Sequence, residues 1–214
     1  MDIDPRQYEN TAINDDDIHN IVLSYLVHNC YKDTVESFIT TTGVTKPVVF
    51  EDMEKRKRVF MLALEGDALK AIELTEQLAP GLLDKSKDLH FDLLTLHFVE
   101  LVCSRKCTEA VEFARTKLTP FGDVQKYVEK LEDFMALLAY EEPEKSPMFH
   151  LLSSEYRQHV AESLNRAILA HANLPSYPAV ERLMQQTVVV RQYLDQEQDK
   201  FLLFFCRKVF RIFL

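Results

Sequence analysis

The sequence predicts an all-α fold, and three observations indicate it. Only 4 of the 214 residues are glycine, which is unusual for sheet or phosphate-loop architectures and compatible with helices. Hydrophobic residues make up 47% of the chain, as in an ordinary folded protein. Between the glycines and prolines, the apolar residues recur at helical rather than alternating spacing. We therefore expect a stack of about nine short antiparallel helices.

The first predicted helix begins near Asn14, which can cap it, as can one of the aspartates that follow. Its apolar residues recur at i, i+3, i+4, i+7 and i+8 and so share one face of a helix. They are Ile18, Ile21, Val22, Tyr25 and Leu26. This stripe is too apolar to remain exposed, and pairing with a second copy of the chain would bury it.

Three further segments carry helical signals of different kinds. Residues 89–102 are apolar nearly all round, which is typical of a central helix packed on several sides. Residues 124–138 combine an apolar stripe with a charged opposite face, and residues 180–188 repeat that apolar spacing. Only Val48, Val49 and Phe50 hint at extended structure, and this stretch is too short for a sheet.

Composition excludes several classes of function. The net charge of −9 argues against nucleic acid as a partner, because phosphate binding needs clustered Lys and Arg. Four cysteines are too few for a disulfide scaffold, and the acidic start does not resemble a signal peptide. No segment reaches the roughly 20 apolar residues that cross a bilayer. We expect a protein of the cytoplasm and nucleus that has no membrane or nucleic-acid partner.

Catalytic and metal-binding motifs are missing from the sequence. Cys103 and Cys107 lack two further zinc ligands, and we expect no metal and no cofactor. An enzyme hypothesis rests only on Glu100 with His97 or His90, from which no nucleophile–base–orienter set can be assembled. We expect Glu100 to pair with a cation from a neighbouring helix. The basic run 55–58 follows acidic residues within one turn and predicts a solvated helix face.

Residues 14–46 resemble a LisH motif, a short helical dimerisation element. The positions that carry the resemblance are Ile18, Ile21, Val22, Tyr25, Leu26, Tyr31, Thr34 and Phe38. The glycine that usually precedes the aromatic residue of the inter-helix turn is Cys30 here. The resemblance implies homo- or hetero-dimerisation through the apolar and aromatic side chains of this set, which are all of them except Thr34.

Two more stretches resemble the motifs that follow LisH in one scaffold family. Residues 52–109 are similar to a CTLH motif through Arg58, the Gly66-Asp67 turn, Leu82-Leu83 and Glu100-Leu101, among others. Residues 105–196 are similar to a CRA domain, with signatures at 109–114, 118–121, 137–140 and 143–147. Residues 197–214 form an atypical hydrophobic tail. Three explanations of this tail stay open. It comes from an alternative or truncated transcript, it binds a membrane surface, or it packs against other protein segments.

The LisH–CTLH–CRA resemblance implies a non-catalytic scaffold of a multi-subunit GID/CTLH-type ubiquitin ligase. Its implied partners are RING-type, Ran-binding-protein-M-like and armadillo-repeat subunits. The CTLH–CRA region would offer them a second surface, for which the candidate residues are Phe91, Leu93, Phe98, Leu101, Tyr127, Leu131 and Phe134. The alternatives are a free-standing helical peptide-binding adaptor and a Ran-binding-protein-M-like signalling scaffold.

Overall fold

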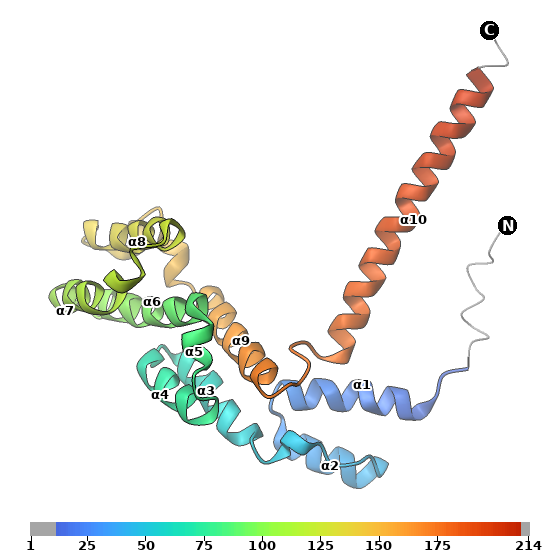
Figure 1. Cartoon of the computed structure of the whole chain (residues 1–214), viewed down its shortest axis with the longest axis horizontal. Helices are drawn as coiled ribbons and strands as arrows, with labels where there is room; N and C mark the ends of the chain where they lie inside the picture. Colours follow the sequence, from blue (N-terminus) through green and yellow to red (C-terminus); the bar gives the residue numbers. More distant parts are fainter. Residues whose placement is uncertain (1–11, 211–214) are drawn as a thin grey trace. The chain divides into compact units, whose positions relative to one another are not determined.

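A computed structural model describes the backbone of residues 12–210 and the burial of residues 12–196. Over residues 12–210 it contains ten α-helices and no strand (Figure 1). This confirms the predicted all-α class. Val48–Phe50, where the sequence hinted at extended structure, forms a 3-10 turn. The chain divides into two compact units, residues 1–47 with 177–214 and residues 48–176.

The first unit is built from three helices, α1 (Asp15–His28), α2 (Lys32–Thr42) and α10 (Ala179–Phe210). Helix α1 packs against both α2 and α10. Of the candidate caps in the sequence, the Asn14 side chain caps α1 by accepting a hydrogen bond from the Asp16 amide at 3.1 Å. The Ser24 hydroxyl accepts one from the first amide of α10, at Ala179, over 3.0 Å. The start of α10 is thereby tied to the middle of α1.

In the turn between α1 and α2, the residue with a left-handed backbone conformation is Cys30 and not a glycine. Cys30 is buried and has a φ of 58°, a region that glycine adopts at little cost and other residues rarely enter. The next amide, at Tyr31, donates to the Leu26 carbonyl at 3.0 Å and closes the end of α1. The cysteine therefore occupies a backbone conformation that suits the glycine of the resembled motif.

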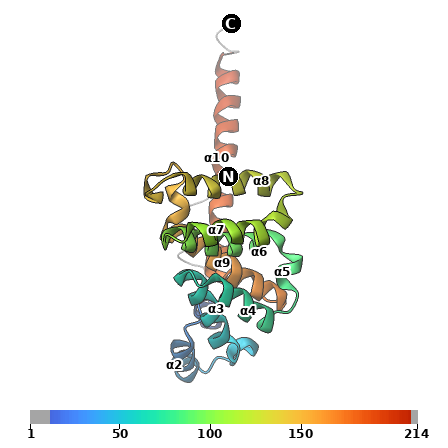
Figure 2. The same cartoon turned by 90° about the vertical axis from the view of Figure 1, so that its left-hand side faces the viewer.

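The second unit has seven α-helices between residues 48 and 176. They are α3 (Met53–Glu65), α4 (Ala68–Leu78), α5 (Leu82–Lys85), α6 (Lys87–Cys103), α7 (Cys107–Phe113), α8 (Gln125–Ala136) and α9 (Ser154–His171). One π turn (Ala114–Leu118) and 3-10 turns (Thr119–Phe121, Leu137–Ala139, Pro143–Lys145, Phe149–Leu152) complete it. Helix α6 lies between the α3–α4 pair and α8 (Figure 2).

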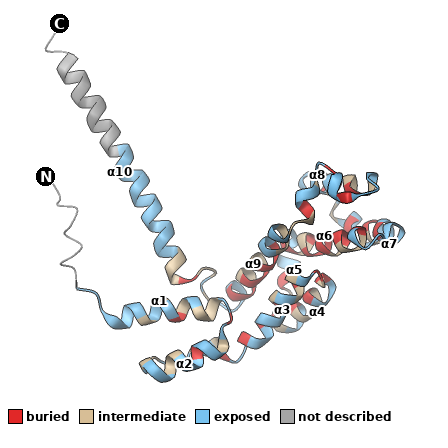
Figure 3. Ribbon diagram, turned by 180° about the vertical axis from the view of Figure 1, so that it is seen from behind, coloured by how far each residue is buried: buried red, intermediate tan, exposed pale blue. Residues whose placement is uncertain are grey.

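Helix α6 belongs to both hydrophobic cores of the second unit. Leu89, Leu93 and Leu96 enter a cluster with residues of α3, α4 and α9. Phe91 and Phe98 enter the other cluster, with residues of α7 and α8. Figure 3 shows buried residues on α6 and α9. The prediction of a central helix at 89–102 is confirmed, because two layers use opposite sides of one helix.

Helix α3 packs along α9, and this contact corrects the prediction for the basic run 55–58. Arg56 is only 3% exposed, and its Nη1 donates to the Asn165 side-chain oxygen at 2.7 Å. Lys55, Lys57 and Arg58 are exposed, as a solvated face requires. The prediction was wrong for Arg56 because α9 covers that one side of α3. A buried guanidinium needs such a partner, since leaving it unpaired costs several kcal/mol.

The units do not follow the sequence order of the predicted motifs. Residues 14–46, the LisH-like stretch, contain α1 and α2. The CRA-like stretch 105–196 is shared between the units, because residues from Tyr177 onward group with α1 and α2. Helix α10 runs on to Phe210 through most of the predicted tail. Among the described residues, no helix is long and apolar enough to cross a membrane.

Candidate interaction surfaces

Helix α1 leaves much of its predicted apolar stripe exposed. Ile18 and Tyr25 are each 44% exposed, and Val22 and Tyr31 are also exposed. Ile21, Leu26 and Phe38 are half-buried, with the Phe38 ring packed edge-on against His19 at 5.8 Å. The buried residue of α1 is Leu23, which is not in the stripe. Contacts within the first unit thus partly cover Ile21 and Leu26 and leave Ile18, Val22 and Tyr25 at the surface.

Helix α10 is the second source of exposed apolar side chains in this unit. Its described side chains beyond Glu181 are all exposed up to residue 196 (Figure 3). The large apolar ones are Leu183, Met184, Val188, Val189, Val190, Tyr193 and Leu194. The helix that the apolar spacing at 180–188 predicted is present, but most of its apolar stripe is exposed within this chain. Soluble monomers rarely expose contiguous patches of this kind, which are typical of interaction sites.

Most residues predicted to form the second partner surface lie in the interior of this chain. Phe91, Leu93, Phe98, Tyr127 and Phe134 are all buried. Leu101 and Leu131 are half-buried against the second core cluster. The five buried residues therefore belong to the core of the folded chain and not to its surface. The prediction failed for them because an apolar periodicity marks burial without saying which chain provides the cover.

Glu100 forms the ion pair that the sequence led us to expect, and its partner is Arg157 of α9. The guanidinium Nη2 lies 3.2 Å from Glu100 Oε2. The turn between α3 and α4 closes over this pair at Gly66, which has a φ of 90°. A Cβ at Gly66 would lie 2.9 Å from Glu100 Oε2. The Gly66-Asp67 turn thus needs glycine for its conformation and for the approach of a carboxylate.

Replacing Gly66 with alanine is expected to destabilise the chain more than replacing Gly81. Both glycines are in the left-handed region, where alanine costs about 1 kcal/mol. A Cβ at Gly81 meets nothing within 4 Å, whereas at Gly66 it displaces Glu100 from its ion pair. We expect about 0.5–1 kcal/mol of additional loss for Gly66→Ala. Urea unfolding monitored by circular dichroism measures both variants, and equal losses would contradict the role of the Glu100 contact.

The two histidines of α6 pack against aromatic rings. His90 lies edge-on to Phe121 at 5.9 Å and His97 to Phe113 at 4.7 Å. Burial lowers the pKa of both imidazoles. Glu100 is engaged by Arg157, and His97 faces an aromatic ring. The arrangement is that of two histidines at the edge of a core.

A row of polar contacts fastens α8 to α6. Lys126 Nζ and the Tyr127 hydroxyl donate to Asp88 Oδ1, the hydroxyl at 2.6 Å. These two hydrogen bonds hold the pKa of Asp88 below its usual value. One turn further on, Lys130 Nζ lies 3.0 Å from Asp92 Oδ1. Two charged pairs, one helical turn apart, therefore hold α8 alongside α6.

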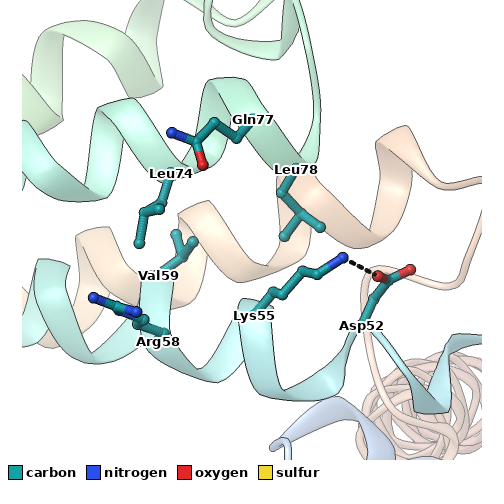
Figure 4. A pocket seen from close by; sticks show the side chains of 7 residues that line it. All are labelled: Asp52, Lys55, Arg58, Val59, Leu74, Gln77 and Leu78. Carbon is teal, nitrogen blue, oxygen red and sulfur yellow. Dashed lines mark hydrogen bonds and ion pairs between the residues drawn. The ribbon is translucent and has the colours of Figure 1, made fainter.

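A groove of about 450 Å³ lies between α3 and α4, and we call it the α3/α4 groove (Figure 4). It is lined by Asp52, Lys55, Arg58, Val59, Leu74, Gln77 and Leu78. Leu74 and Leu78 of α4 point toward α3, where Val59 faces them (Figure 4). Sequence analysis did not find this groove. Its one sequence signal was the basic run, of which Lys55 and Arg58 reach the groove.

Comparison with known proteins gives a family match over most of the chain. Residues 52–195 match the family described as the CTLH/CRA C-terminal to LisH motif domain. This chain belongs to the CTLH/CRA family. The match confirms the family resemblance that the sequence indicated. It extends over α3 to α9 and into α10, so the CTLH/CRA region draws on both compact units.

Relatives of this chain are similar to it over 71% to 86% of its length. A Glucose-induced degradation protein 8 homolog of Nematostella vectensis is 30% identical over 186 residues, covering 86% of this chain and 83% of that protein. The Protein GID8 homolog of Arabidopsis thaliana is 28% identical over 85% of this chain and 75% of its own length. The Ran-binding protein M homolog of Arabidopsis thaliana is 31% identical over 71% of this chain but only 36% of itself.

Proposed function

We propose that this CTLH/CRA chain is a non-catalytic scaffold subunit of a GID/CTLH-type ubiquitin ligase. The observation that carries the proposal is the similarity to GID8 homologs along most of both chains. Similarity over most of both lengths favours a GID8-like role over that of the Ran-binding protein M homolog, of which only 36% is matched. The cytoplasm and nucleus are the compartments in which such a subunit would act.

The scaffold would bridge RING-type, Ran-binding-protein-M-like and armadillo-repeat subunits. Self-association through α1 is one half of this role, because Ile18, Val22 and Tyr25 stay exposed in the folded chain. At about 25 cal/mol per Å², covering such a stripe on two copies supplies several kcal/mol. Part of this gain offsets the free energy lost on association. The second unit would hold different subunits, and the half-buried Leu101 and Leu131 are the predicted contacts that reach its surface.

The chemistry of the described residues supports a non-catalytic role. Glu100 is paired with Arg157, and the nearby His97 packs against Phe113. Both histidines of α6 pack against aromatic rings at the edge of the core, and no nucleophile–base–orienter set is assembled among the described residues around them. Ubiquitin transfer would take place on the other subunits, and this chain would set their spacing.

Affinity purification of the tagged chain from native extract, followed by mass spectrometry, tests this proposal. We expect RING-type and Ran-binding-protein-M-like subunits to co-elute, together with ubiquitin-ligase activity that the chain alone lacks. A second bait that ends at Gln196 controls for the hydrophobic tail. If neither bait recovers a RING-type subunit, the proposed ligase role is wrong.

A further inference from the structure

The α3/α4 groove has an apolar floor that the chain leaves partly open. Val59 is buried beneath it, while Leu74 and Leu78 are half-buried and turn their side chains toward α3 (Figure 4). These three aliphatic residues come from two helices that are held together by the first core cluster. The floor is thus a fixed part of the fold and can receive an aliphatic side chain without rearrangement.

The rim of the groove carries positive charge that is only weakly neutralised. The Arg58 guanidinium makes no ion pair or hydrogen bond with any residue between 12 and 196. Lys55 pairs with Asp52 at 3.4 Å, but both side chains are more than half exposed. Exposed pairs of this kind contribute little and exchange partners readily. Asp67, in the turn between α3 and α4, is already paired with Lys70 at 2.6 Å.

This positive charge is a local feature of an acidic protein. The chain carries a net charge of −9, and the groove on the other side of α4 is lined by Glu73, Glu76 and Asp84. Helix α4 therefore separates a cationic groove from an anionic one. An anionic partner would be repelled by most of the surface and attracted at this position, which favours specificity.

We propose that the α3/α4 groove binds an acidic segment of a partner protein through one carboxylate and an adjacent leucine-like side chain. The Arg58 guanidinium would take the carboxylate in a two-pronged contact, for which its planar donors are suited. Lys55 would add a second charge as it exchanges Asp52 for the partner. The aliphatic side chain would cover Leu74 and Leu78. A nucleic-acid phosphate would satisfy Arg58 but leave this apolar floor uncovered.

Binding of a defined peptide to the full chain tests the proposal, independently of any ligase role. The probe is a fluorescein-labelled helical peptide of about 15 residues with leucines and glutamates on one face. We expect saturable binding by fluorescence anisotropy with a Kd on the order of 100 µM, as for a small contact. Replacing its glutamates with glutamines should weaken binding about tenfold. In 1 M salt, where charges are screened beyond about 3 Å, we expect the binding of the glutamate peptide to weaken by a similar factor.

Matched variants locate the site. Arg58→Glu should weaken binding of the glutamate peptide at least about tenfold. Lys57→Glu makes the same charge change on the next residue, which is exposed but does not line the groove, and should have an effect below about twofold. Leu74→Ala should weaken binding of both the glutamate peptide and its glutamine variant, because it removes part of the apolar floor of the groove. Equal effects of Arg58→Glu and Lys57→Glu, or no saturable binding of the glutamate peptide to the unmodified chain, would overturn the proposal.

Discussion

Phe98→Ala is expected to lower the free energy of unfolding of the second unit by about 3–5 kcal/mol. The Phe98 ring is completely buried in the second core cluster, at the end of α6 that meets α7. Removing it loses the transfer free energy of the ring and leaves a cavity that surrounding helices fill only in part. Urea unfolding monitored by far-UV circular dichroism measures the loss.

The matched control for this variant is Phe149→Ala. Phe149 belongs to the same unit and is 61% exposed, so the same truncation should change stability by less than about 0.5 kcal/mol. The pair also separates a core role for Phe98 from the partner role first predicted for it. If Phe98→Ala unfolded like the unmodified chain and instead failed to bind a partner subunit, the buried placement of Phe98 would be wrong.

Val22→Asp is expected to abolish self-association while leaving the helix content nearly unchanged. Val22 lies in the middle of the exposed α1 stripe, between Ile18 and Tyr25. A dimer contact there would bury an unpaired carboxylate in each copy, at a cost of several kcal/mol. The dimer Kd should rise by more than about 100-fold, which corresponds to about 2.7 kcal/mol. Sedimentation equilibrium measures this change.

Asn20→Asp provides the control, because it adds the same charge on the opposite side of α1, where Asn20 is exposed. We expect it to self-associate like the unmodified chain. Val22 is a sharper test than Ile21 or Leu26, which are half-buried within the chain and would be destabilised by a charge. Continued association of Val22→Asp would show that the α1 stripe is not the self-association surface.

Local signals in the sequence were sufficient for most of the helical architecture. The turn at Gly66-Asp67 ends α3 where the glycine indicated, and Asn14 caps α1. These features depend on backbone conformation and on hydrogen bonds between near neighbours, which are encoded within a few residues. The central position of α6 could also be predicted, because a helix that is apolar on every side requires cover on every side.

Contacts between distant helices could not be read from the same patterns. The buried Arg56 looks like its exposed neighbours in sequence, and only the approach of Asn165, from α9, distinguishes it. The α3/α4 groove is formed by side chains of two helices, with Val59 on α3 and Leu74 on α4, so neither helix shows it by itself.

By itself, the sequence determined the all-α class, the helix boundaries at glycine and proline, and the family to which the chain belongs. Only the tertiary structure decided which apolar stripes are core and which are surface. Tyr127 and Val22 both lie on apolar stripes with helical spacing, yet Tyr127 is buried in the second core cluster and Val22 is exposed. Periodicity measures how apolar a helix face is, whereas burial depends on whether another segment of the same chain lies against it.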